Sequence, residues 1–169
     1  EVGALLIVDG TQSIGALPFS IEKTQPDALI CAGYKWLMGP YSIGLAYYGK
    51  YFDRGTPIED NWINRRGSEN FSGLINYSDN YGSFAARYNV GEQSNFILTP
   101  MLLAGLKQIE NWGVENVQSY CRNLISNEIE KVNKKKYWIE NESYRANHLF
   151  GIKQLDNKSN LIEKLKNKK

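Results

Sequence analysis

The chain has 169 residues, which is long enough for one folded domain with its own hydrophobic core. Apolar residues make up 42% and charged residues 22% of the sequence, as in globular proteins rather than disordered or fibrous ones. The net charge of +2 is too small to indicate nucleic-acid binding. The sequence has no run of the ~20 apolar residues that a membrane span requires and opens with no secretion signal. We therefore expect a cytoplasmic protein with no membrane and no nucleic-acid partner.

Neither a metal site nor a disulfide bond is expected from the cysteine and histidine residues. Cys31 and Cys121 lie far apart in the sequence, and His148 is the one histidine, so the close spacing of zinc ligands is missing. Cys31 falls in an apolar run and Cys121 on the apolar side of an expected helix. We interpret both cysteines as small core residues.

The first half of the chain contains the patterns of buried strands. Residues 4–8 form an apolar run that ends in Asp9, which is typical of a strand buried on both faces of a parallel sheet. Residues 28–31 form a second such run, and Lys35 follows it after a short turn. Two further elements expected in this half are a short helix near residues 20–24 and a strand at residues 43–48.

The second half is expected to be mainly helical after a long loop. Residues 53–90 are polar, contain scattered Gly, Asn and Ser, and predict a long ordered loop region. Thr99 as N-cap and Pro100 at the first position predict a helix that ends near Gly113. The remaining expected elements are a helix over residues 114–136, a strand over residues 148–153 and an amphipathic helix around residues 161–165.

Asp9 and Lys35 are the candidate chemical groups. Each is expected at the carboxyl end of a strand, where open α/β sheets bind their ligands. A carboxylate keeps a neighbouring pyridine nitrogen protonated, and a lysine amine can bind an aldehyde and then move protons. Gln12 lies three residues after Asp9 and can approach the same ligand from the turn. The pair is by itself a weak indication, because aspartate and lysine often follow strands.

The residues around this pair are much more specific. Residues 8–15 (VDGTQSIG) and 27–44 (DALICAGYKWLMGPYSIG) resemble the class V aminotransferase family of fold-type I enzymes, which use pyridoxal 5'-phosphate (PLP). This family includes cysteine desulfurases, selenocysteine lyases, kynureninases and isopenicillin N epimerase-like proteins. The resemblance continues through Asn61 and Trp62 and through residues 87–95 (RYNVGEQSN). It implies a PLP-dependent transferase or lyase that acts on a small amino-acid substrate.

The resemblance also implies the architecture. It predicts an α/β chain that forms part of a fold-type I PLP-binding large domain, with a mostly parallel sheet and flanking helices, plus the start of the small C-terminal domain. Residues 1–113 would be the C-terminal half of the large domain, and residues 114–169 the connecting helix and partial small domain. The chain would then be a fragment of a longer enzyme, which in its full-length form would be a homodimer.

Three site residues follow from the resemblance by position. Lys35 corresponds to the catalytic lysine that forms the Schiff base with PLP. Asp9 corresponds to the partner of the pyridine nitrogen, and Gln12 to the neighbour of the ring hydroxyl. No metal ligand is implied.

Other cofactor contacts differ from the family pattern. Tyr34 stands where many members have histidine, and its hydroxyl can donate to the cofactor phosphate. Ala32 replaces a serine or threonine and cannot donate. Trp62 falls where kynureninases place a tryptophan that contacts the cofactor, although it could equally be an aromatic residue packed under a loop.

Several alternatives stay open at this point. Transamination, desulfuration, another lyase reaction and epimerisation all fit the shared cofactor. Arg65, Arg66 and Arg87 are poor substitutes for the arginine that usually holds the substrate carboxylate, and we expect the first two at the surface. A catalytically degenerate partner subunit is the main competing function. A flavodoxin-like nucleotide-binding module is disfavoured, because no glycine-rich fingerprint follows a strand.

Overall fold

The computed structural model describes residues 2–76, 78–93, 95–132, 134–155 and 161–168, and the side chains of all of these except residues 161 and 162. The chain divides into two compact units, Glu1–Asn111 and Trp112–Lys169, which we treat separately. This division rests on compactness alone. The assignment of residues 1–113 and 114–169 to family domains therefore stays a prediction.

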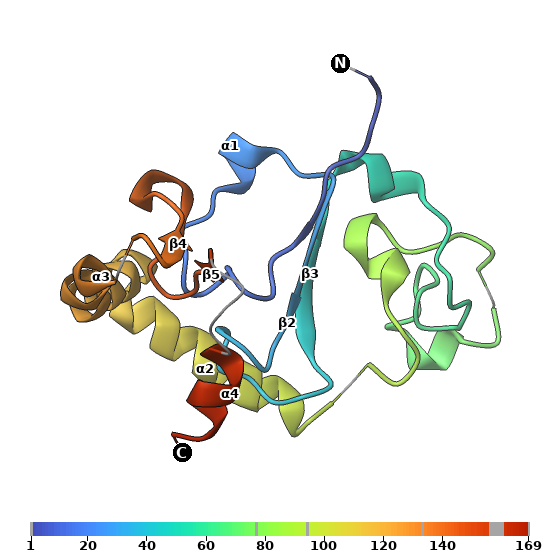
Figure 1. Cartoon of the computed structure of the whole chain (residues 1–169). Coiled ribbons are helices and arrows are strands. Elements are labelled where there is room, and N and C mark those ends of the chain that lie inside the picture. The colour runs from blue at the N-terminus through green and yellow to red at the C-terminus, as the bar shows by residue number, and fades with distance from the viewer. Residues whose placement is uncertain (1, 77, 94, 133, 156–160, 169) are drawn as a thin grey trace. The chain divides into compact units, whose positions relative to one another are not determined.

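The first unit contains a three-stranded sheet in the order β1-β2-β3 (Figure 1). β1 (Ile7–Asp9) runs parallel to β2 (Ala28–Ala32), and β3 (Gly44–Tyr48) runs antiparallel to β2. The three predicted strands are confirmed, although β1 begins three residues later than expected. Because β1 and β2 are parallel, the segments that follow Asp9 and Ala32 leave the sheet at the same edge.

The connection between β1 and β2 is fixed by side-chain hydrogen bonds. It contains α1 (Ile21–Thr24), the short helix predicted near residues 20–24, which is confirmed. The Ser20 hydroxyl caps α1 by accepting from the Lys23 N–H at 3.2 Å. The Asp27 carboxylate then accepts from the Leu6 N–H at 2.8 Å, so the start of the parallel pair is held by a side chain as well as by the backbone.

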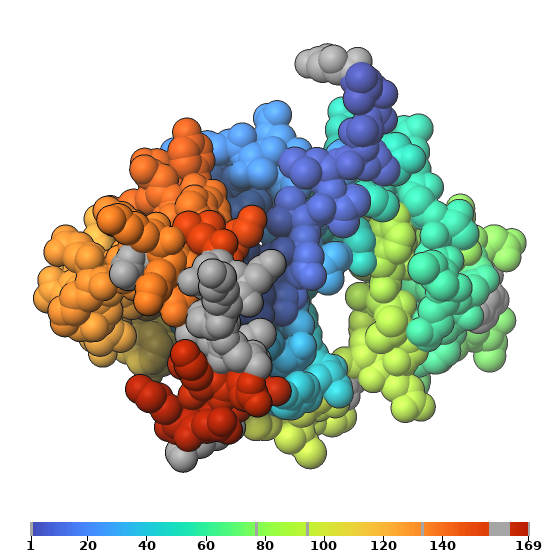
Figure 2. Space-filling model, in the orientation of Figure 1, coloured from blue at the N-terminus to red at the C-terminus, as the bar shows by residue number. Residues whose placement is uncertain are grey.

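The two faces of the sheet are covered unequally. Leu29 and Cys31 of β2 point to one face and are only 7% and 2% exposed. Ile7 and Ile30 lie on the other face and are 52% and 41% exposed. The prediction that β1 is buried on both faces is therefore wrong, because no described residue of the first unit covers this second face. In Figure 2 the dark blue segment that leads into β1 is seen at the surface.

α2 (Leu98–Trp112) packs against the turns that follow β1 and β2, where Ile109 lies beside Gly15 and Leu102 beside Gly39; these two side chains are 7% and 5% exposed. Gly105 allows a close approach between α2 and the segment that follows Lys35. A Cβ atom at Gly105 would lie 2.6 Å from the Leu37 carbonyl oxygen, so only glycine fits there without displacement of the backbone.

The start of α2 differs from the prediction. Thr99 was expected as N-cap, but the helix already begins at Leu98. The Asn95 side chain explains the earlier start, because its Oδ1 accepts from the N–H groups of Ile97 and Leu98 at 3.1 and 2.7 Å. The predicted end near Gly113 is confirmed, since α2 ends at Trp112.

The predicted long ordered loop region is confirmed in the part of it that the structure describes. It contains the 3-10 helices Lys50–Arg54, Phe71–Gly73 and Phe84–Tyr88. The Tyr88 ring lies 4.6 Å from the Tyr48 ring of β3, and its hydroxyl donates to the Phe52 carbonyl. These contacts join the end of the loop region to the sheet.

The second unit is built on α3 (Val114–Lys131). Its other elements are β4 (Tyr137–Ile139), a 3-10 helix (Glu142–Tyr144), β5 (Ile152–Gln154) and α4 (Leu161–Lys166). β4 and β5 pair antiparallel, with Ile139 opposite Ile152. No helix among the described residues is long and apolar enough to cross a membrane.

Two predictions for the second unit need correction. The helix expected to reach residue 136 ends at Lys131, because Val132 has an extended backbone (ψ 127°). The strand expected over residues 148–153 is instead the shorter β5. Gln118 of α3 holds the preceding segment, since its side chain contacts His148 Nδ1 at 2.8 Å and accepts from the Asn147 N–H at 3.1 Å. The predicted terminal helix is confirmed as α4.

We expect Gly15→Ala to destabilise the protein more than Gly67→Ala. Both glycines have positive φ, 94° and 82°, so alanine is strained at either position, at a cost of about 1–2 kcal/mol. At Gly15 the new Cβ would also lie 2.6 Å from the Trp36 carbonyl oxygen, whereas Gly67 has no atom within 4 Å. Urea unfolding should show about 1–3 kcal/mol of additional loss for Gly15→Ala. Equal losses would contradict the close contact.

Candidate functional site

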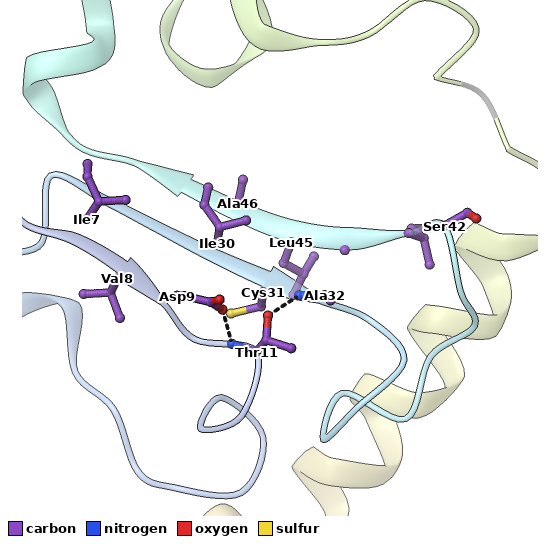
Figure 3. Close-up of a pocket in the computed structure, with 12 residues that line it drawn as sticks. Ile7, Val8, Asp9, Thr11, Ile30, Cys31, Ala32, Ser42, Leu45 and Ala46 are labelled. Atoms are coloured by element: carbon purple, nitrogen blue, oxygen red, sulfur yellow. Dashed lines mark hydrogen bonds between the residues drawn. The ribbon is translucent and has the colours of Figure 1, made fainter.

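Asp9 presents an ionised carboxylate at the carboxyl end of β1 (Figure 3). Its Oδ1 accepts from the Thr11 N–H at 2.9 Å. This bond and a second one from the Thr11 side chain lower the pKa of Asp9 below its usual value. The Asp9 side chain is exposed, so the carboxylate can accept a further hydrogen bond from a cationic ligand group.

Lys35 follows β2 in a tight loop. The loop is closed by hydrogen bonds from the Met38 N–H to the Lys35 carbonyl, 3.0 Å, and from the Gly39 N–H to the Gly33 carbonyl, 2.8 Å. The Lys35 side chain is exposed, and its Nζ lies 5.4 Å from the centre of the Tyr34 ring. A ligand at this edge of the sheet can therefore reach the amine.

Tyr34 is held by aromatic stacking. Its ring lies 4.4 Å from the ring of Tyr41, at an interplanar angle of 17°. Because Tyr41 comes from the segment just before β3, the stack fixes the Tyr34 ring from outside its own loop. Tyr34 is still 40% exposed, so it remains accessible to a ligand.

An open hollow of about 660 Å³ lies along the uncovered face of the sheet. Figure 3 shows that its walls are mostly apolar side chains of the three strands, with Asp9, Thr11 and Ser42 as polar members. Among the described residues, its lining includes neither Lys35 nor Trp62. Asp9 therefore stands where this apolar face meets the edge that the lysine loop follows.

The predicted site residues are brought together only in part. Gln12 is exposed in the turn that directly follows β1, and its approach to the ligand of Asp9 stays a prediction. Lys35 and Tyr34 follow β2 at the same edge of the sheet. Trp62 lies in the long loop region, where its ring packs edge-on against Phe71 at 5.4 Å. Its contact thus matches the packed-aromatic alternative, and a role at the cofactor stays a prediction.

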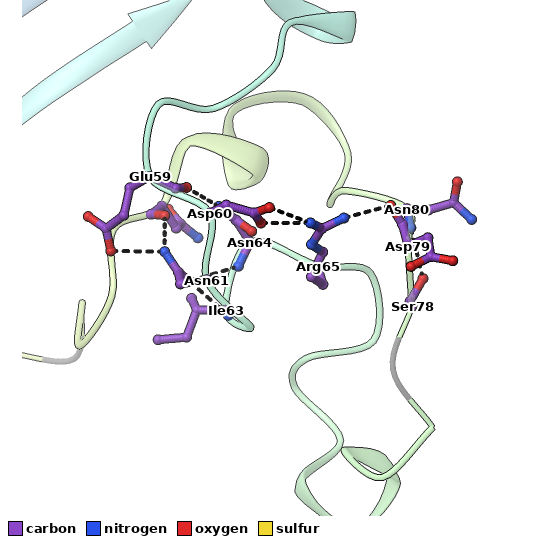
Figure 4. A network of polar contacts seen from close by, with 10 residues as sticks. Glu59, Asp60, Asn61, Ile63, Asn64, Arg65, Ser78, Asp79 and Asn80 are labelled. Atoms are coloured by element: carbon purple, nitrogen blue, oxygen red, sulfur yellow. Dashed lines mark hydrogen bonds and ion pairs between the residues drawn. The ribbon is translucent and has the colours of Figure 1, made fainter.

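Arg65 is the centre of a polar network in the loop region (Figure 4). Its Nη2 bonds both carboxylate oxygens of Asp60 at 2.6 and 2.8 Å, and its Nη1 donates to the Asp79 carbonyl at 2.7 Å. The guanidinium also lies 4.3 Å above the Tyr81 ring. With its side chain 16% exposed, Arg65 is not the surface residue that we expected. Its guanidinium joins two parts of the loop region and already has hydrogen-bond partners there. Arg66, in contrast, is exposed.

A second part of this network ties the loop region to the segment before α2. Asn64 is fully buried, and its Nδ2 donates to the Glu59 carbonyl at 2.7 Å. The Glu59 carboxylate accepts from the Asn61 side chain and from the Gly91 N–H. Sequence reasoning missed this network, although the polar residues Glu59, Asp60, Asn61 and Asn64 were a signal for it.

Cys31 has the properties of a core residue. It is 2% exposed. Burial, and next the negative charge of Asp9, raise the pKa of the Cys31 thiol, so it stays protonated and is a poor nucleophile. Cys121 is half-buried on α3. No group of three or more His, Cys, Asp or Glu side chains that could hold a metal ion occurs among the described residues.

We expect iodoacetamide to alkylate Cys121 at least about tenfold faster than Cys31 in the native full-length protein at pH 8, because only a thiolate reacts. Mass spectrometry of quenched samples would measure both rates. In the urea-unfolded protein the two cysteines should react at similar rates, which is the control. Equal labelling in the native state would contradict the burial of Cys31.

The chain is similar to known proteins. The family model described as "Aminotransferase class-V" matches residues 1–149. A "probable cysteine desulfurase" of Pyrococcus abyssi is 40% identical over 52 residues, 31% of this chain and 13% of that protein. The match confirms the resemblance that residues 8–15 and 27–44 predict.

Two solved structures share the fold. The apo cysteine desulfurase of Thermococcus onnurineus NA1 is 22% identical with a TM-score of 0.66, over 98% of this chain and 40% of that one. A C-DES mutant with glycine covalently linked to its PLP cofactor is 18% identical with a TM-score of 0.71, over 97% and 42%. The predicted α/β fold of the fold-type I class is confirmed, and the chain spans about two fifths of the length of these structures.

Proposed function

Because this chain belongs to the class V aminotransferase family, we propose that it is part of a PLP-dependent enzyme that acts on an amino acid. Class V aminotransferases use PLP. The observation that carries the proposal is the ionised Asp9 carboxylate at the same sheet edge that the Lys35 loop follows. This pair of groups fits the pyridine nitrogen and the aldehyde of PLP.

The two residues would have different tasks. The Asp9 carboxylate would accept a hydrogen bond from the protonated pyridine nitrogen and stabilise its positive charge. The Lys35 amine would bind the cofactor covalently and, once the substrate has displaced it, move a proton at the α carbon of the substrate. When bound, PLP supplies an electron sink for the negative charge that develops at that carbon.

The other site residues orient the cofactor. Gln12 lies in the turn after Asp9 and would hydrogen-bond the ring hydroxyl. Tyr34 would donate its hydroxyl to the phosphate, and the stack with Tyr41 would hold its ring for this contact. Ala32 has no side-chain donor, so the phosphate needs further donors. Trp62, which packs edge-on against Phe71 in the loop region, would be a further cofactor contact.

The proposed reaction class is transamination or a lyase reaction of an amino acid. In both reactions a bond at the α carbon of the substrate is broken first, and the same lysine takes part. Relatives of the chain are named cysteine desulfurases. A desulfurase reaction would require a nucleophile other than Cys31, because this thiol is buried and protonated.

We expect sodium borohydride to fix PLP on Lys35 of the full-length protein. The protein is incubated with PLP, its absorbance spectrum is recorded, and the reduced adduct is mapped by peptide mass spectrometry. Lys35→Ala should abolish the adduct, because the amine that binds the aldehyde is lost. Lys23→Ala, a change at an exposed lysine of α1, should leave it intact. An adduct at another residue would overturn the proposed site, and no adduct would favour the degenerate partner subunit.

We also propose that the chain is a fragment of a longer cytoplasmic enzyme that forms a homodimer. The support for a fragment is twofold. The chain spans only 40% and 42% of the two similar structures. Ile7 and Ile30 also expose an apolar sheet face, which further residues of a longer chain would cover.

We expect the uncovered sheet face to be detectable with the dye anilinonaphthalene sulfonate, which fluoresces on exposed apolar surface. Residues 1–169 expressed alone should bind more dye than the protein of the complete reading frame, because Ile7 and Ile30 become covered in the latter. Ile30→Lys in the isolated chain should reduce the binding. A complete reading frame without any upstream half would contradict the fragment proposal.

A further inference from the structure

The parallel pair of β1 and β2 ends irregularly. The Gly10 N–H donates to the Ile30 carbonyl at 2.7 Å. In a regular parallel ladder, the Gly10 carbonyl would then accept from the N–H of Ala32, two residues further on β2. The Gly10 carbonyl instead accepts from the N–H groups of Ser13 and Ile14 at 3.0 and 2.8 Å, because the chain turns at this point. The Ala32 N–H therefore needs another acceptor.

Thr11 supplies this acceptor. Its Oγ1 accepts from the Ala32 N–H at 3.0 Å (Figure 3). Thr11 also donates to Asp9 Oδ1 through its backbone N–H at 2.9 Å. The bond to Ala32 uses a lone pair of the hydroxyl and leaves its hydrogen available, and the Thr11 side chain is the second cause that lowers the pKa of Asp9. Thr11 thus joins the carboxyl ends of the two strands, through its N–H at Asp9 and its hydroxyl at Ala32.

The backbone of the turn that carries Thr11 is tightly packed. A Cβ atom at Gly10 would lie 2.6 Å from Ile14 Cγ1 and 2.7 Å from Cys31 Sγ, so the turn is packed tightly against both side chains. Cys31 is buried and directly precedes Ala32. A shift of the turn would therefore disturb the ends of both strands. The tight packing thus holds in place the Asp9 carboxylate and the Ala32 N–H, which Thr11 connects.

We propose that Thr11 is a positioning residue of the cofactor site, which holds the Asp9 carboxylate in one orientation and ties it to the β2 end that leads to Lys35. The inference rests on the proposed PLP function. Ala32 lies three residues before Lys35, so the bridge connects the two groups that the cofactor must contact at once. A positioned carboxylate loses less freedom on binding the pyridine nitrogen, which favours cofactor affinity.

The test compares Thr11→Val, Thr11→Ser and Thr24→Val in the full-length protein. Valine has the shape of threonine but lacks the hydroxyl, serine retains the hydroxyl, and Thr24 is an exposed threonine of α1 that serves as control. Two measurements need no cofactor. They are hydrogen exchange of the Ala32 amide and NMR titration of the ¹³C-labelled Asp9 carboxyl. A third is the dissociation constant of PLP from fluorescence titration.

We expect Thr11→Val to speed exchange of the Ala32 amide at least about tenfold, since its acceptor is lost. The pKa of Asp9 should rise toward the ordinary aspartate value. The dissociation constant of PLP should increase about tenfold to hundredfold, as for the loss of a hydrogen bond to a charged group. Thr11→Ser should stay close to wild type in all three measurements, and Thr24→Val should be unchanged.

The outcomes separate this inference from the proposed function. Unchanged exchange and an unchanged Asp9 pKa in Thr11→Val, together with a Lys35 adduct, would overturn the role of Thr11 and leave the function standing. No Lys35 adduct in the wild type would overturn both. If Thr11→Val does not fold, amide exchange in the wild type and in Thr11→Ser decides. Fast exchange of the Ala32 amide in the wild type would overturn the bridge, and slow exchange in both proteins would support it.

Discussion

The parallel pairing of β1 and β2 is the constraint on which the proposed site depends. It directs the segments after both strands to one edge of the sheet, and only there can Asp9 and Lys35 serve one ligand. β1 has just three residues, so its ladder is short. Side chains extend the pairing at each end, because Asp27 accepts from the Leu6 N–H and Thr11 accepts from the Ala32 N–H.

Much of this arrangement could be predicted from local pattern. The apolar runs that became β1 and β2, and the positions of Asp9 and Lys35 after them, depend on neighbouring residues and were visible in the sequence. Two of the errors arose where a distant or flanking polar side chain decided the outcome. Asn95 starts α2 before the expected Thr99, and Gln118 of α3 holds the segment around His148. Patterns of hydrophobicity carry no information on such contacts.

The same limit applies to the candidate site. The roles of Lys35 and Asp9 followed from family resemblance, but the contacts that orient them did not. Thr11 contacts both Asp9 and Ala32, which are 2 and 21 residues away. The sequence predicts Arg65 at the surface, but its partners Asp60 and the Asp79 carbonyl approach it once the loop has folded. Both cases are hydrogen bonds across loops, where the residue type permits many partners.

Covering the exposed sheet face would also affect the charge of Asp9, which the Thr11 hydrogen bonds stabilise. Full burial of an isoleucine side chain stabilises a protein by about 1.5–3 kcal/mol, so Ile7 and Ile30 strongly favour a covered face in the proposed longer enzyme. Asp9 belongs to the same hollow, and its cover would remove water from the carboxylate. Desolvation raises the pKa of a carboxyl group, whereas N–H and O–H donors lower it. Hydrogen bonding by the Thr11 backbone and side chain lowers the pKa of Asp9 and therefore opposes this effect, so it would keep Asp9 ionised for the proposed contact with a protonated pyridine nitrogen.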